Sequence, residues 1–178
     1  MEGKIIEGGY NIKNLGGVVA TGLGISIERT NHSYRYEGCN VIDTAVRNAV
    51  LNNAENIGGI ISVAEGNNGS PYITRCYIAN AVMNGGTVGS IVGCDGSSAM
   101  RYTVSYVVVD DTNAYPNIGR YSEQAVSQTV FGAQILRVPY DGLKIDGISY
   151  VLGENWICDS NFNDGFAFPS KIKKFLQK

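Results

Sequence analysis

Short aliphatic runs that contain a pair of small residues recur along the chain. Three copies begin at Leu15, Ile57 and Val88, and a weaker copy begins at Ile118. The last three starts are 31 and 30 residues apart, whereas the first stands 42 residues before the second, which indicates an insertion of about a dozen residues. Self-similarity at a period of roughly 20–50 residues is typical of solenoids, propellers and other arrays. The pattern therefore predicts a repeat protein.

A second segment follows each of the first copies and keeps its order along the chain. It covers residues 38–43, 75–80 and 104–110, and Cys39, Cys76 and Ser105 occupy the same position in the three copies. Because Cys and Ser interchange at this position, we expect the three residues to stack as small buried side chains, and the cysteines to be free thiols. Asn80 and Asp110 close the second and third copies, where we expect them to cap turns.

Clusters of Gly, Asn and Ser separate short segments that alternate in polarity or are wholly apolar. Residues 72–82, 87–93 and 101–109 are rich in β-branched and aromatic residues and predict strands. Residues 43–53 suit a helical turn by propensity, but their position in the repeat favours strand. A unit of about 30 residues cannot bury its own face, so stacked coils must pair each strand with its equivalents above and below. The pattern predicts an all-β fold, a right-handed parallel β-helix or β-solenoid of about five or six coils.

The repeats divide a single predicted domain, residues 1–178. Its units are expected near residues 15–56, 57–87, 88–117 and 118–147. An inserted loop is expected at residues 30–38 and a C-terminal cap at residues 148–178. The small-residue pairs would let neighbouring backbone approach closely. The basic tail at residues 170–176 suits a short helix or strand that closes the stack, because solenoids need atypical ends to blunt exposed strand edges.

Composition and charge narrow the range of partners. Only 17% of the residues are charged and 23 of 178 are Gly, which suits a sheet-rich protein with many tight turns. The formal net charge of -2 and the lack of a basic stripe argue against nucleic acid. No apolar run is long enough to span a membrane. The cysteines form no C-x-x-C pair and no phosphate-binding glycine loop occurs, so we expect no metal and no cofactor.

Groups that could catalyse a reaction are few. The one histidine, His32, lies in the predicted insertion, away from any Ser or Cys nucleophile. Asp110 and Asp111 are adjacent, and adjacent strand residues point to opposite faces, so the two cannot flank one glycosidic bond. Residues 159–165 carry oxygen ligands at alternate positions, as calcium loops do, but lack the terminal Glu, and ordinary turn chemistry is favoured. We therefore predict that the chain is not an enzyme.

Residues that depart from the repeat are the candidates for contact with a partner. Aromatic and Arg side chains dominate the energetics of interfaces. On this basis we predict contacts, with a protein or a surface glycan, by His32, Tyr34, Arg35, Tyr36, Tyr115 and Arg120.

The order of these segments resembles a known repeat. Residues 57–61 (IGGII) followed by residues 73–80 (ITRCYIAN) resemble the GLUG repeat of bacterial surface proteins, in which a "GGLVG" strand precedes an "I-x-N-C-Y" strand. Residues 7–15 (EGGYNIKNL) are similar to the "DGNGYTIKNL" opening of such domains. Trp156 with residues 162–169 is similar to their closing "W…NDGYP" segment. The resemblance implies an adhesin-like or protease-associated surface module, used as a spacer or for binding, without catalytic residues.

Similar β-solenoids also build phage tail fibres and capsid decorations. The first seven residues include two acids and no long apolar core follows, so they are not a secretory signal, and a start at Met1 is expected for a virion component released by lysis. The predicted function is a non-enzymatic structural or binding module of a virion or a cell surface. Such a product would stay cytoplasmic until lysis if phage-encoded, and would be a homotrimer if it forms a fibre. Two alternatives stay open: a carbohydrate-active β-helix enzyme, and a phage-encoded inhibitor of a host protein.

Overall fold

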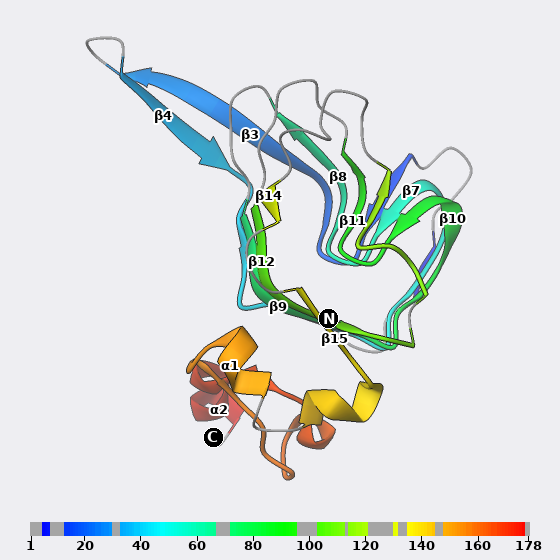
Figure 1. Ribbon diagram of the computed structural model, residues 1–178, viewed down its shortest axis with the longest axis vertical. Coiled ribbons are helices and arrows are strands. Elements are labelled where there is room, and N and C mark those ends of the chain that lie inside the picture. The colour runs from blue at the N-terminus through cyan, green and yellow to red at the C-terminus, as the bar shows by residue number, and fades with distance from the viewer. Residues whose placement is uncertain are drawn as a thin grey trace.

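Strands dominate the computed structural model, which confirms the predicted all-β class (Figure 1). The structure describes residues 5–7, 13–29, 33–66, 72–95, 103–112, 114–120, 130–131, 135–144 and 148–176. None of the helices in these ranges has the length and hydrophobicity of a membrane span.

Three sheets of parallel strands form the body of the protein. The first sheet contains β1 (Ile5–Glu7), β2 (Asn14–Gly16), β7 (Val50–Gly58) and β10 (Val82–Gly89). The second has the order β13 (Ile118–Arg120), β11 (Val92–Asp95), β8 (Ile61–Gly66), β3 (Val19–Arg29), and β4 (Ser33–Gly38) joins its outer edge in antiparallel fashion. The third contains β5 (Val41–Ile42), β6 (Ala45–Arg47), β9 (Tyr72–Ala79), β12 (Thr103–Asp110), β14 (Val130–Phe131) and β15 (Ile135–Val138).

The chain passes through the three sheets in the same order again and again, and we call each passage a rung. Rung 1 is β1, β2, β3, β5 and β6; rung 2 is β7, β8 and β9; rung 3 is β10, β11 and β12. Rung 4 has described strands in the second and third sheets only, namely β13, β14 and β15. Val50 pairs with Val82, 32 residues later, and Ile61 pairs with Val92, 31 residues later. Leu15 pairs with Ile57, 42 residues later. The repeat spacing expected from the sequence is therefore the spacing between paired strands.

Equivalent residues of successive rungs stack in columns. In the third sheet, two columns of apolar side chains are buried between the sheets, namely Val41, Ile73 and Val104, and Val46, Ile78 and Val109. Polar columns are linked by side-chain hydrogen bonds, since Asn80 Nδ2 donates to Asn48 Oδ1 (2.8 Å) and Asn84 Nδ2 to Asn52 Oδ1 (3.2 Å). Such ladders fix the register of one rung on the next.

The glycine pairs lie where the chain turns from the first sheet into the second. A Cβ added at Gly58 would lie 1.8 Å from the carbonyl oxygen of Ile61, and one at Gly59 would lie 2.0 Å from the carbonyl oxygen of Ser90 in the next rung. Gly16 and Gly89 stack on Gly58 and meet the same obstruction. The expected close approach of backbone at these pairs is confirmed.

The expected alignment of the second segment is wrong. Cys76 pairs with Val107, and Ser105 pairs with Thr74, so Cys76 and Ser105 do not stack. Cys39 lies two residues before Val41, which pairs with Ile73, so it is not level with Cys76 either. All four thiols are nevertheless free, as expected. The alignment of Cys76 with Ser105 failed because a slip of two residues along a strand leaves every side chain on its own face.

The fourth copy of the first segment is displaced for the same reason. Ile118 pairs with Val92 in the second sheet, whereas the sequence aligns it with Val88. The carbonyl of Pro116 accepts the hydrogen bond of the Ser90 N–H (2.7 Å), as the carbonyl of Gly89 does for Gly59 (3.1 Å). A shift of four residues also preserves the alternation of faces, so the hydrophobic pattern could not detect it.

The expected loop at residues 30–38 is wrong in part, because residues 33–38 form strand β4. β4 pairs with the second half of β3, from Gly24 opposite Gly38 to Arg29 opposite Ser33. We call this two-stranded hairpin, residues 24–38, the arm. The favoured reading of residues 43–53 as strand is confirmed, because they contain β6 and the start of β7.

The third sheet bends at a column of residues with left-handed backbone. Asp43, Arg75 and Tyr106 have φ of 51°, 52° and 54°, and they follow Ile42, Thr74 and Ser105, which are paired in register. The break separates β5 from β6 in rung 1. We call this column the corner; in Figure 1 the strands of the third sheet change direction along their length.

The C-terminal segment, residues 140–176, covers the outer face of the third sheet below the other strands in Figure 1. It contains η1 (Tyr140–Lys144), α1 (Ser149–Leu152), β16 (Trp156–Ile157), η3 (Asn163–Gly165), β17 (Phe168–Pro169) and α2 (Ser170–Leu176). Its apolar side chains pack on one outward column that runs through all four rungs: Ala45, Tyr77, Val108 and Leu136. The tail at residues 170–176 is thus a helix, and the segment that carries it lies on a face of the sheet, not across the end of the stack as expected.

Candidate functional site

The arm carries three of the residues that the sequence predicts as partner contacts. β3 pairs with β8 only through residues 19–24, and in the described part of the chain its remaining residues pair only with β4. Tyr34, Arg35 and Tyr36 lie on β4, at the positions paired with residues 28, 27 and 26. Figure 1 shows the arm extending away from the three sheets. His32 lies outside the described residues.

Tyr115 has an internal role. Its hydroxyl donates a hydrogen bond to the carbonyl oxygen of Met83 (2.6 Å), and its own carbonyl accepts hydrogen bonds from Ser90 Oγ (2.9 Å) and Arg137 Nη2 (2.6 Å). These bonds tie the chain before rung 4 to rung 3. Whether Tyr115 also touches a partner stays a prediction.

Arg120 is exposed on β13, and its guanidinium nitrogens donate to Cys94 Sγ at 3.3 and 3.4 Å. β13 and β4 are the two outermost strands of the second sheet, with β11, β8 and β3 between them. The structure therefore does not gather the predicted contacts into one site: the arm and Arg120 lie at opposite edges.

A pocket that the sequence did not predict lies between rung 1 of the third sheet and the C-terminal segment. Its volume is about 330 Å³. The sheet contributes Asp43, Thr44, Ala45, Arg47 and Tyr77, and the segment contributes Asn163, Ala167, Phe168, Pro169 and Ile172. Polar side chains from two strands thus face a largely apolar wall. We call this space the rung-1 pocket.

The corner supplies one end of the pocket. Asp43 accepts two hydrogen bonds from Arg75, from Nε at 2.6 Å and from Nη2 at 3.0 Å, and a third from Trp156 Nε1 at 3.3 Å. The Arg75 hydrogen bond and charge lower the pKa of Asp43 against the opposing effect of burial. Asp43 is therefore a carboxylate at neutral pH and accepts hydrogen bonds only.

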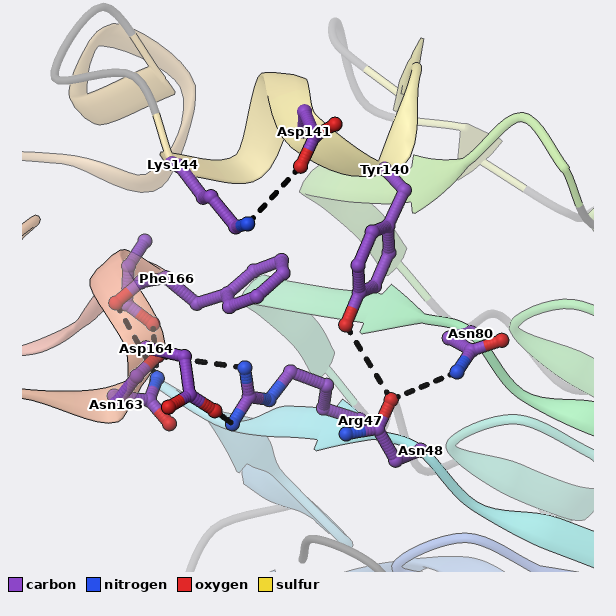
Figure 2. A network of polar contacts seen from close by, with 10 residues as sticks. Arg47, Asn48, Asn80, Tyr140, Asp141, Lys144, Asn163, Asp164 and Phe166 are labelled. Atoms are coloured by element: carbon purple, nitrogen blue, oxygen red, sulfur yellow. Dashed lines mark hydrogen bonds and ion pairs between the residues drawn. The ribbon is translucent and has the colours of Figure 1, made fainter.

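Arg47 supplies the other end and joins the sheet to the segment (Figure 2). Its side chain is only 3% exposed, and Nη2 donates to Asp164 Oδ2 at 3.0 Å, while that Asp side chain is 80% exposed. The guanidinium carbon lies 4.3 Å from the centroid of the Phe166 ring, and Lys144 Nζ lies 4.8 Å from the same centroid. Figure 2 shows the two cations on opposite sides of the ring. Cation–π contacts on both sides hold Phe166 in place.

A second contact in this network fixes the start of the C-terminal segment. Tyr140 Oη donates to Asn48 Oδ1 at 3.4 Å, the same oxygen that accepts from Asn80 (Figure 2). Tyr140 also packs on Phe166, with 4.7 Å between ring centroids. The outer wall of the pocket is thus anchored in rungs 1 and 2.

The titratable groups around the pocket are in unreactive states. Burial raises the pKa of Tyr77 to about 12, so its hydroxyl stays protonated. Burial likewise raises the pKa of Cys76 to about 12, which removes the thiolate that a nucleophile needs. The residues that line the pocket therefore offer hydrogen-bond donors and acceptors in fixed protonation states.

The carboxylates singled out in the sequence have structural partners. Asp110 is buried and accepts from the backbone N–H groups of Asn80 (2.9 Å) and Thr112 (3.0 Å), which confirms its expected turn-capping role. Asp159 accepts from Lys173 Nζ at 2.6 Å, and Asp164 pairs with Arg47. Among the described residues, no three His, Cys, Asp or Glu side chains cluster in a way that could hold a metal ion.

The sequence did contain one sign of the covered face on which the pocket depends. Residues 76–79 (CYIA) and 107–109 (VVV) are continuous apolar runs, which are typical of strands buried on both faces. Such runs indicate that another part of the chain packs on the outer face of the third sheet. Nothing in the local pattern placed Arg47 beside Asp164, because the two are 117 residues apart.

Comparison of the chain with protein-family models finds no match, and comparisons with curated proteins and with solved structures find no significant match. The likeness to GLUG repeats therefore stays a prediction from the residues quoted above.

Proposed function

We propose that the chain is a right-handed parallel β-solenoid of the GLUG type that acts as a non-enzymatic structural or binding module. The near-constant offset of 31 or 32 residues between paired strands of rungs 2 and 3 supports a solenoid, as do the stacked apolar and Asn columns. The setting we favour is a virion, as a fibre or decoration component, or a cell surface.

The observation that carries the binding role is the arm. A two-stranded ribbon that leaves its sheet is marginal in water by itself, and edge strands that offer unpaired backbone are normally shortened or covered. Here six residue pairs, from Gly24–Gly38 to Arg29–Ser33, extend the ribbon, and it carries Tyr34, Arg35 and Tyr36. Tyr and Arg are the residues that most often dominate binding energy at interfaces. We assign the arm to contact with a protein or glycan partner.

The experiment that tests this role removes the arm and keeps the stack. Gly24 and Gly38 lie opposite each other, so residues 25–37 can be replaced by an Asn-Gly turn, which closes a two-residue hairpin. The pairing of β3 with β8 over residues 19–24 stays in place. Fluorescently labelled protein is then incubated with intact bacterial cells and with immobilised surface polysaccharides.

We expect binding by the full chain to at least one of these surfaces, and its loss in the armless variant, while the circular dichroism spectrum keeps its strand signal. A matched control variant, Tyr72→Ala, changes an exposed aromatic residue outside the arm and should bind as the parent does. Equal binding with and without the arm would refute the assignment. Release of new reducing ends from the polysaccharides would instead support the carbohydrate-active enzyme and overturn the non-enzymatic role.

A further inference from the structure

The rung-1 pocket can be reached from solvent. Ile172, on its rim, is 44% exposed, and the Asp43 side chain is 31% exposed. Its volume of about 330 Å³ is at the small end of the range of ligand pockets, which suits one sugar ring and excludes a drug-sized ligand. An occupant would touch both the sheet and the C-terminal segment.

The polar residues that line the pocket include both hydrogen-bond donors and hydrogen-bond acceptors. Asp43 is an ionised acceptor at the corner, and Arg47 is a donor four residues later on β6. Tyr77 also lines the pocket, and its protonated hydroxyl, which hydrogen-bonds the Asn163 side chain, can form one more hydrogen bond. A sugar hydroxyl also donates and accepts, so neighbouring hydroxyls of one ring can satisfy Asp43 and Arg47 together.

The charges in and around the pocket balance. Asp43 is paired with Arg75, and Arg47 is paired with Asp164. Two neutralised ion pairs favour an uncharged polar ligand over an anion or a cation. The opposite wall, with Ala167, Phe168, Pro169 and Ile172, suits the C–H face of a sugar ring.

The edge of the third sheet next to the pocket does not suit an extended peptide. Among the described residues no strand pairs with the outer side of β5 and β6. These strands have two and three residues, and the left-handed Asp43 interrupts them. A short, broken edge is a poor template for strand addition. The geometry therefore favours a saccharide over a peptide.

Arg47 is the one basic residue in its column of the third sheet, among the described residues. The equivalent residues in rungs 2 to 4 are Ala79, Asp110 and Val138. The partner of Arg47, Asp164, is 80% exposed, so water screens their ion pair and the pair contributes little to stability. Arg47 holds Asp164 and Phe166 of the C-terminal segment, and it also lines the pocket, where a cationic donor can serve a ligand.

We propose that the rung-1 pocket binds one neutral sugar unit of a glycan. This site is independent of the arm and of the function proposed for it. Trp156 is the single tryptophan of the chain and donates to Asp43, so its fluorescence reports occupancy of the pocket. Methyl glycosides of neutral hexoses and N-acetylhexosamines are the probes, with methyl glucuronide, methylammonium and short peptides alongside.

We expect a saturable change in Trp156 emission with at least one neutral glycoside, and saturation-transfer NMR signals from the same compound. Arg47→Met and Tyr77→Phe should weaken the affinity roughly tenfold, the worth of one good hydrogen bond in a buried site. Tyr72→Ala, which removes an exposed aromatic outside the pocket, and the armless variant should bind as the parent does. Thermal unfolding of Arg47→Met checks that its fold persists.

Three outcomes would overturn the proposal. One is the absence of any saturable signal from the neutral glycosides in both measurements. Another is affinity unchanged in both Arg47→Met and Tyr77→Phe. The third is saturable binding of only the charged probes or the peptides. Loss of cell binding in the armless variant, with glycoside binding intact, would separate this site from the arm.

Discussion

Replacing Gly58 with Ala tests whether the glycine column sets the geometry of the stack. The new Cβ would lie 1.8 Å from the carbonyl oxygen of Ile61, 2.6 Å from its carbonyl carbon and 2.7 Å from the backbone nitrogen of Gly93. All three are backbone atoms, and both residues lie in strands of the second sheet or beside them. No side chain can rotate away, so the strands themselves must move.

Two effects of opposite sign determine how much Gly58→Ala changes the free energy of unfolding. Gly58 has no left-handed φ, so Ala gains about 0.4–1 kcal/mol through the lower entropy of the unfolded chain. Overpacking of a tightly packed site costs typically about 1–3 kcal/mol and more where backbone must shift. Since the contact is well over an ångström inside van der Waals distance, the clash dominates and leaves a net loss of about 2–3 kcal/mol. In a domain of this size the loss corresponds to a fall in Tm of about 5–10 °C.

Thermal unfolding followed by circular dichroism measures the change in Tm, and urea unfolding measures the change in the free energy of unfolding. Gly142→Ala is the matched control, because its Cβ would meet nothing closer than Val138 Cβ at 3.2 Å. Gly16→Ala and Gly89→Ala should repeat the effect, since both stack on Gly58. A Gly58→Ala protein that melts within about 2 °C of the parent, or a control that loses as much, would refute the stacked-turn geometry.

Three further changes probe separate interactions. Tyr115→Phe should lower the free energy of unfolding in urea by about 1 kcal/mol, because the Met83 carbonyl loses its 2.6 Å donor; no change would show that water replaces it. Asp43→Asn should make the protein less stable in a way that depends on pH. A carboxyl whose pKa is lowered in the folded state stabilises that state above its unfolded pKa of 3.8, and this contribution is lost as the pH falls through the folded pKa. The difference in the free energy of unfolding between variant and parent should therefore be constant between pH 7 and about pH 5 and shrink below pH 3.8. Cys76 should resist iodoacetamide at pH 8 in the native protein while half-buried Cys39 and Cys158 are labelled, as peptide mass spectrometry would show, and early labelling of Cys76 would contradict its burial.

The repeat was readable from the sequence because its cause is local. Gly58 and Gly59 have neighbours that leave no room for a Cβ, so the chain must carry small residues at each equivalent turn. The same constraint recurs at Gly16 and Gly89, which makes the period visible without a structure. The all-β class followed from the short apolar segments between these turns.

The register was not readable, because it depends on which residues lie opposite each other. Cys76 pairs with Val107 instead of Ser105. The two possible pairings differ by two residues, so the same side chains point inward in either one. The left-handed positions at which the sheet bends are occupied by Arg75 and Tyr106. Neither residue is a Gly or Asn, the types that would mark a left-handed position in the sequence. The rung-1 pocket was hidden for a related reason, since Arg47 meets Asp164 only once the C-terminal segment lies on the sheet.

Both proposed sites include residues of the first rung. The arm leaves the second sheet at Gly24 and returns at Gly38, and β5 begins at Val41, so only two residues separate the arm from the strands that line the pocket. Rungs 2 and 3 keep the regular spacing and supply the core, whereas rung 1 carries an insertion and a buried Arg where its equivalents have Ala79, Asp110 and Val138. In a stack where each rung contacts only its neighbours, an end rung is free to vary without disturbing the core of the others. Both proposals place recognition at rung 1, so a partner that contacts the arm while its own glycan fills the pocket would form the second contact at a high effective concentration.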